Sequence, residues 1–237
     1  PPGRTAAEDL DYVIQNIAQH PNVAPFVSTR LIQRLVMGNP SPAYVGRVAG
    51  VFRSTRGDLR ATVRAILTDP EADSPAATQG KLREPVLFVL STLRGLDATV
   101  TIDNGLNGYA NNMGQNLWNA PSVFNYFSPS FRVNGIVAPE FQINTPSVAL
   151  LRANFAYRAG RNGLGEAARI DSGHFERLAS DPPQLVEALN QALLAGAMAP
   201  AMKTSIVNAI TATNDMRLRA RNAIFLVAAS SQFQVEP

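Results

Sequence analysis

Apolar residues recur every three or four positions along most of the chain, which is the period of an α-helix with one apolar face. The first seventy residues contain four such stretches. Thr5 and Glu8 have the spacing of a capping box, so we expect the first helix to start there and to end before Pro21. The expected starts of the next three helices are Asn22, Ser41-Pro42 and Asp58.

The same period returns after residue 85 and again after residue 145. Proline is favoured in the first turn of a helix, because its fixed φ suits the helix and its missing N–H removes no bond there. The prolines at such positions are Pro42, Pro85, Pro146, Pro182 and Pro200. No stretch shows the sustained two-residue alternation of a half-buried strand, and no internal repeat is visible. The sequence predicts an all-α, multi-helix bundle-like domain.

Residues 97–147 interrupt the helical pattern. This stretch contains nine Asn and seven of the 17 aromatic residues of the chain, with little regular period. We expect a long, mostly irregular excursion that is rich in Asn and aromatic side chains. The expected organisation is a single domain over 1–237, in which helical residues 5–95 and 145–230 share one core because neither group has enough apolar surface to be independent.

The charge balance excludes some classes of function. The formal net charge is only +3, and 19 of the 21 basic residues are Arg, since Lys81 and Lys203 are the only lysines. A nucleic-acid binder usually gathers basic residues on one face, so we expect no nucleic-acid partner. The absence of Cys excludes disulfides and thiolate sites. The longest apolar run, residues 223–229, is far shorter than the ~18 residues of a membrane span, so we expect no such span.

The two histidines, His20 and His174, offer little for a metal centre. His20 lies at an expected helix end, where a histidine can interact with the terminal carbonyls. Asp171, His174 and Glu176 could supply mixed nitrogen and oxygen ligands, although a short acidic cluster in a Gly-rich segment is typical of a hydrophilic surface. No dinucleotide, phosphate-loop or zinc-helix motif occurs. We therefore expect no metal and no cofactor.

The excursion carries the strongest candidate for a binding site. Asn side chains offer donors and an acceptor, and aromatic rings offer apolar platforms, a combination that suits a polyhydroxylated ligand such as a glycan. The candidate ligand-binding residues are Tyr109, Asn116, Trp118, Asn119, Asn125 and Tyr126. The alternative is a segment that wraps a helical core, with its rings buried and its Asn residues holding turns.

Carboxylates allow a second functional hypothesis. Hydrolysis of a glycosidic bond generally requires two carboxyl groups, one on each side of the scissile bond. Glu84, Asp103 and Glu140 are the candidate acid and base residues for a hydrolase acting on a glycan or an ester. A carboxylate buried against a basic partner would instead be architectural.

Several long stretches resemble one bacterial family. They are LDYVIQNIAQHPNVAPFVSTRLIQRLVMGNPSPAYVGRVAGVF and RGDLRATVRAILTDPEA within residues 10–72, GKLREPVLFVLSTLRG in 80–95, NAPSVFNYFSPSF in 119–131, VAPEFQINTPS in 137–147 and the terminal FLVAASSQFQVEP. In this order they are similar to the C-terminal half of the "domain of unknown function 1800" family. The matching residues are Gly80, Lys81, Arg83, Glu84 and Pro85; Pro121, Ser122, Phe124 and Asn125; and Pro139, Glu140 and Phe141.

The resemblance implies a longer protein whose N-terminal helical portion is absent from this chain, and the first helices should then expose an apolar face toward that portion. It also implies export to the periplasm or the cell surface, and genes often placed beside a sulfatase-like partner family. It implies no established activity, cofactor or catalytic residue. The expected function is that of a binding or structural protein of the cell envelope, contacting a glycan or an envelope protein partner.

Overall fold

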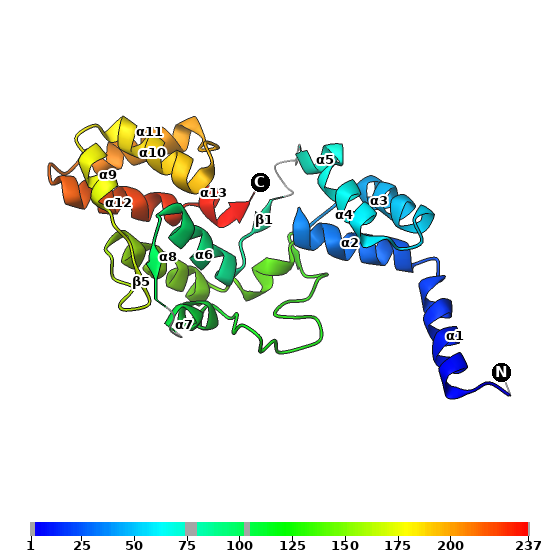
Figure 1. Cartoon of the computed structure of the whole chain (residues 1–237). Helices are drawn as coiled ribbons and strands as arrows, with labels where there is room; N and C mark the ends of the chain where they lie inside the picture. The colour runs from blue at the N-terminus through cyan, green and yellow to red at the C-terminus, as the bar shows by residue number, and fades with distance from the viewer. Residues whose placement is uncertain (1–2, 74–79, 102–104, 237) are drawn as a thin grey trace. The chain divides into compact units, whose positions relative to one another are not determined.

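The computed structural model describes residues 3–73, 80–101 and 105–236 (Figure 1). Helices account for most of these residues, and the prediction of an all-α fold is confirmed. The chain divides into two compact units, one formed by Pro1–Gly80 with Gly135–Val137, the other by Lys81–Asn134 with Ala138–Pro237. Each unit is described separately below, and the single domain expected over 1–237 stays a prediction.

The first unit is built from short helices whose starts the sequence marks. They are α1 (Ala6–Ala18), α2 (Val23–Leu35), α3 (Pro42–Ser54), α4 (Leu59–Leu67) and α5 (Pro70–Asp73). The capping box of Thr5 and Glu8 is formed, and the side chains of Ser41 and Asp58 cap α3 and α4. Asn22 occupies the N-cap of α2 but makes no side-chain capping bond, because its backbone is in the helical region.

A small apolar core joins α2, α3 and α4. Its fully buried side chains are Ile32, Met37, Tyr44, Val48 and Ile66. In contrast, α1 has no buried residue, and the stripe that contains Leu10, Val13, Ile14 and Ile17 is about half exposed or more. The core of this unit therefore does not include the first helix.

The second unit holds the larger core. Its helices are α6 (Pro85–Gly95), α7 (Gly105–Asn112), α8 (Pro146–Gly160), α9 (Gly173–Leu178), α10 (Pro182–Leu194), α11 (Pro200–Ile210), α12 (Met216–Ala228) and α13 (Ser231–Gln234), with the 3-10 helix η1 (Pro139–Ile143). The main contact is between α8 and α12, and α10 packs on both α11 and α12. Helix α6 packs into this core through Phe88, Val89 and Leu93.

Two helix contacts depend on glycine. A Cβ built at Gly160 in α8 would lie 2.8 Å from the carbonyl oxygen of Arg221 in α12. A Cβ at Gly95 in α6 would lie 2.7 Å from the carbonyl oxygen of Ala192 in α10. The missing side chains thus let these backbones approach closely.

The strands are only two residues long. β1 (Lys81–Leu82) pairs antiparallel with β6 (Val235–Glu236), and β2 (Thr99–Val100) pairs antiparallel with β5 (Ala168–Arg169). The other two are β3 (Arg132–Val133) and β4 (Ile136–Val137). Strands this short give no periodic signal in a sequence, yet the pairs β1–β6 and β2–β5 connect segments that are far apart along the chain.

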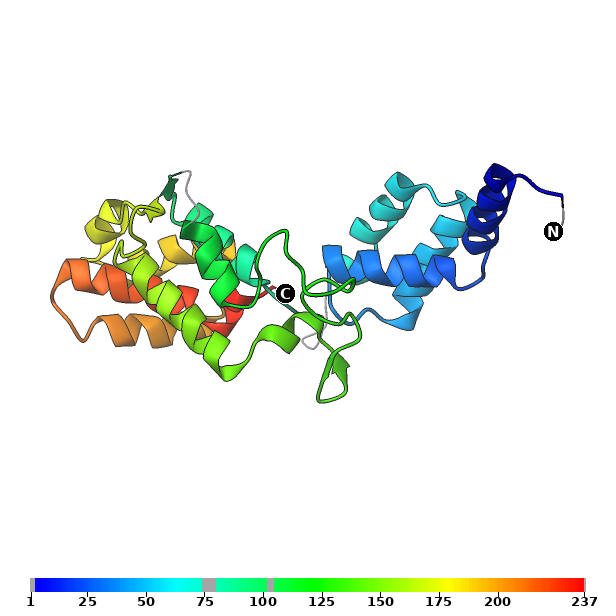
Figure 2. The ribbon, with the colours of Figure 1, turned by 90° about the horizontal axis from the view of Figure 1, so that it is seen from below.

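The excursion over 97–147 is mostly irregular, as expected, and follows a long path without helix between α7 and η1 (Figure 2). The helix α7 and the 3-10 helix η1 lie inside it and were not predicted. None of the described helices combines the length and the apolar character that a bilayer span requires.

Candidate functional site

A pocket of about 290 Å³ opens between α7 and the segment that precedes β5. The pairing of β2 with β5 brings these two segments together, and the N–H of Thr101 extends the pairing by donating to the carbonyl of Ala167 at 3.2 Å. The loop after α8 is fixed by Asn162, whose side-chain oxygen accepts from the N–H of Ile170 at 2.9 Å. The wall before β5 is therefore held by backbone bonds to β2 and by the side chain of Asn162.

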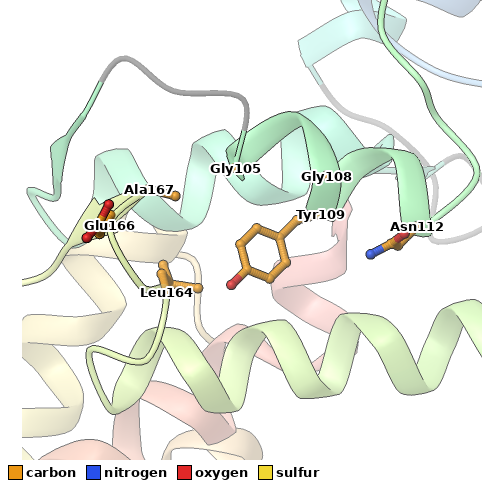
Figure 3. Close-up of a pocket in the computed structure, with 7 residues that line it drawn as sticks. All are labelled: Gly105, Gly108, Tyr109, Asn112, Leu164, Glu166 and Ala167. Carbon is orange, nitrogen blue, oxygen red and sulfur yellow. The ribbon is translucent and has the colours of Figure 1, made fainter.

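The pocket is lined by a mixture of glycine, apolar and polar residues: Gly105, Gly108, Tyr109, Asn112, Leu164, Glu166 and Ala167. Figure 3 shows Tyr109 projecting from α7, with Glu166 and Asn112 on either side of it. Leu164 and Ala167 are buried and form the apolar floor, whereas Glu166 and Asn112 are exposed at the rim. The site can accept a small ligand that has both apolar and polar faces.

Tyr109 is fixed by the core rather than by a hydrogen bond. Its ring meets the ring of Phe155 edge-on, with centroids 5.1 Å apart, and it packs against the core of the second unit. Its hydroxyl makes no hydrogen bond to any of the described residues. Because the ring is fixed and its hydroxyl makes no bond within the described residues, the hydroxyl can form a hydrogen bond with a ligand hydroxyl group.

Gly108 leaves open space on the α7 wall. No heavy atom lies within 4 Å of a Cβ built at this position. Gly105, Gly108 and Asn112 follow one another at spacings of three and four, which places them on one face of α7. That face therefore presents backbone and one amide side chain to the pocket.

The structure separates the six predicted ligand-binding residues. Tyr109 lines the pocket, whereas Asn116 and Tyr126 contact each other in the irregular segment, where the tyrosine hydroxyl donates to the Asn116 carbonyl. Trp118 and Asn119 are exposed in that segment. Asn125 has a positive φ of 73° in a turn with Ser122, the kind of role that the turn-holding alternative describes.

Of the three candidate catalytic carboxylates, two are described by the structure. The Glu140 carboxylate is buried, and its Oε1 lies 3.8 Å from Nζ of the equally buried Lys81. Glu84 accepts a hydrogen bond from the side chain of Gln115, which in turn accepts from the N–H of Val86 at 2.9 Å. Asp103 lies outside the described residues. The contacts of Glu84 and Glu140 are those of architectural groups.

A buried arginine in α8 contacts the backbone of the segment that precedes α6. Arg152 in α8 is completely buried, and its Nη2 donates to the carbonyl of Arg83 at 2.7 Å. Burial lowers the pKa of its guanidinium to about 10. The guanidinium also lies over the ring of Phe88, 5.1 Å from its centroid. These contacts tie α8 to the segment between β1 and α6.

The possible metal ligands are engaged locally. The N–H of Gly173 donates to Asp171 Oδ1 at 2.9 Å, and Glu176 accepts from Ser172 at 2.7 Å. Over the described ranges, no three His, Asp or Glu side chains gather closely enough to hold a metal ion. His20 accepts from the N–H of Asn22 at 3.2 Å, a local contact at the helix end.

Sequence reasoning missed most of the pocket. Glu166, Leu164 and Ala167 lie far along the chain from α7, and no pattern links them to it. The one sequence feature that points to the pocket is the spacing of Gly105, Gly108 and Asn112. In a helix over residues 105–112 this spacing places the three residues on one face.

The comparisons with known proteins give a family and no function. Residues 2–235 match the model of a family described as "Protein of unknown function (DUF1800)". No curated protein and no solved structure matches the chain.

Proposed function

The chain belongs to this family of unknown function, and from that premise we propose that it is an exported binding protein of the cell envelope that holds one sugar unit of a glycan in the α7 pocket. The observation that carries the proposal is the available hydroxyl of Tyr109 between Asn112 and Glu166 above an apolar floor (Figure 3). The envelope location rests on the family resemblance alone.

The chemistry of the lining supports a sugar. A sugar ring has an apolar face, which would meet Leu164 and Ala167, and a rim of hydroxyls, which would meet Tyr109, Asn112 and Glu166. At about 290 Å³ the pocket is at the small end for ligand sites, which span ~300–1,000 Å³. It therefore suits one sugar unit rather than a long chain.

The charge of the pocket narrows the class of sugar. Glu166 is the one charged side chain among the described lining residues, and it makes no ion pair with any described residue. A neutral or an amino sugar is therefore favoured over an acidic one, which the carboxylate would repel.

Binding is favoured over hydrolysis. A hydrolase of the two-carboxylate type needs a second acid beside Glu166, and the described lining offers none. Glu140 is occupied by its buried contact with Lys81. Hydrolysis by Glu84, Asp103 and Glu140 stays a prediction without a supporting contact.

The test is a glycan array followed by calorimetry on the tightest neutral sugar, using the chain as given. Tyr109→Phe keeps the ring packed on Phe155 and removes only the hydroxyl, so we expect binding to weaken by roughly three- to tenfold. Gly108→Leu fills the open side of α7 and should abolish binding.

The matched control is Gly46→Ala in α3, another helical glycine with open space around it and outside the pocket. It should leave the affinity unchanged, and thermal melting should show all three variants folded. Full affinity in a folded Gly108→Leu variant would refute the pocket as the site, and an array without any binder would refute the glycan.

A further inference from the structure

Residues 116–126 form a closed loop, called here the apolar loop. At its base the Tyr126 hydroxyl donates to the carbonyl of Asn116. At its far end the N–H of Asn125 donates to the Ser122 carbonyl at 3.0 Å, and the N–H of Phe124 donates to the Ser122 hydroxyl at 3.1 Å. The loop is therefore closed by hydrogen bonds both at its base and at its far end.

The loop carries exposed apolar side chains. Trp118 is fully exposed at 101%, Val123 at 96% and Phe124 at 63%. By contrast, Met113 before the loop and Phe127 after it are buried at 1% and 4%. The flanking residues thus anchor a segment in which Trp118, Val123 and Phe124 remain in water, an unfavourable arrangement unless another surface covers them.

The backbone conformation of Trp118 also indicates that the exposed loop has a function. Its φ of 65° lies in the left-handed region, which bulky residues rarely adopt. The side chain gains no packing that would offset this strain, because it is fully exposed. Residues held in such sparsely populated backbone conformations cluster at functional positions.

The surrounding sequence shows what kind of surface would fit. Residues 104–131 contain no Asp, Glu, Lys, Arg or His. The polar residues of the loop are Asn, Ser and Tyr126, all of them neutral, and their side chains can bond to lipid headgroups. No charge would have to leave water if the loop entered an apolar phase, where a charged side chain is costly.

We propose that the apolar loop inserts Trp118, Val123 and Phe124 into the surface of a lipid bilayer. Tryptophan favours the boundary between headgroups and hydrocarbon, where its ring is in the apolar layer and its N–H reaches water or headgroups. A protein interface would share the aromatic side chains, and the vesicle experiment below distinguishes the two kinds of partner.

The chain offers a direct probe, because Trp118 is its only tryptophan. The experiment records tryptophan fluorescence of the chain during titration with vesicles of pure phosphatidylcholine. These vesicles carry no net charge, so the net charge of the protein cannot drive binding. We expect an emission typical of exposed indole without lipid and a shift to shorter wavelength with lipid.

The variant Val123→Asp/Phe124→Asp keeps Trp118 and introduces two charges at the tip of the loop. Its partition coefficient should fall by at least roughly tenfold. The matched control, Met216→Asp/Leu218→Asp, charges two exposed apolar residues in the first turn of α12 and should leave the shift intact.

An emission that stays unshifted at saturating lipid would overturn the proposal. So would a shift that the loop variant retains, because insertion would then not depend on these side chains. Sugar binding by the α7 pocket is measured without lipid, and its outcome is independent of this one.

Discussion

The side chains of Lys81 and Glu140 meet at 3.8 Å in a place where both are almost completely buried. One belongs to β1 and the other to η1, and these two elements are in contact. The contact brings together two of the stretches, 80–85 and 139–141, that carry the family resemblance. Its position indicates that these residues maintain the architecture of the second unit.

Removing one partner of this pair should lower the stability of the folded chain. Glu140→Ala leaves the Lys81 ammonium buried without that carboxylate, and we expect the free energy of unfolding to fall by about 3 kcal/mol. Replacing both by Met should cost less than the single substitution, because the Lys81 ammonium and the Glu140 carboxylate are then removed together. Urea unfolding of the three proteins measures the difference. Equal losses in the single and double variants would contradict an ion pair.

The close approach of α8 and α12 gives a second prediction. Gly160→Ala places a methyl group 2.8 Å from the Arg221 carbonyl oxygen, so the helices must separate. We expect a loss of about 2 kcal/mol in the free energy of unfolding. Gly46→Ala is the control, since its methyl group meets open space in α3 and should stabilise the chain by ~0.5–1 kcal/mol. Calorimetric melting that ranks the two variants in the opposite order would refute the contact.

Tyr44 makes the first unit sensitive to alkali. Burial, and then the nearby Asp69 and Glu71, raise the pKa of Tyr44 to about 12. Its hydroxyl donates to the carbonyl of Ile66 at 2.7 Å. The pKa in the unfolded chain is ~10, so the stability contributed by the neutral phenol is complete below pH ~10 and is lost as the pH rises toward 12.

The variant Tyr44→Phe isolates this effect. At neutral pH it should be less stable than the wild type by ~1 kcal/mol, because the Ile66 carbonyl loses its partner. The gap should narrow between pH 10 and 12, as measured by denaturant unfolding across that range. A gap that widens with pH would contradict a raised pKa of Tyr44 in the folded chain.

Relief of backbone strain gives a prediction for the apolar loop. Trp118 has a φ of 65° and no packing, and Asn adopts this conformation more readily. Trp118→Asn should therefore stabilise the chain by ~0.5–1 kcal/mol in thermal unfolding. A clear destabilisation would indicate that the indole packs on the protein and is not available to a lipid surface.

The helices could be predicted because their signals are local. Thr5, Ser41 and Asp58 cap the helices that they were expected to cap, and Pro85, Pro146, Pro182 and Pro200 begin α6, α8, α10 and α11 as expected. Helix α7 was missed because its glycine and asparagine residues are poor helix formers. It is held by tertiary packing of Leu106 and Tyr109 on the core, which a sequence does not display.

The site was predictable only in part for the same reason. Tyr109 was identified from composition, but its partner Glu166 reaches the pocket through the pairing of β2 with β5. Trp118 is predicted for the same site because its ring lies beside Asn residues in the sequence. The structure puts it in the apolar loop instead, where its exposure supports a different partner.

The proposal with the widest consequences is sugar binding by the α7 pocket rather than by the apolar loop. It is tested most directly by a two-dimensional ¹H–¹⁵N NMR titration of the labelled chain with cellobiose, maltose and diacetylchitobiose, and with glucuronic acid as the acidic comparison. We predict that a neutral sugar shifts the amide signals of Gly108 and Glu166, leaves the single Trp118 indole signal in place, and outcompetes the acidic sugar. Movement of the Trp118 indole signal with unmoved Gly108 and Glu166 amides would contradict the account.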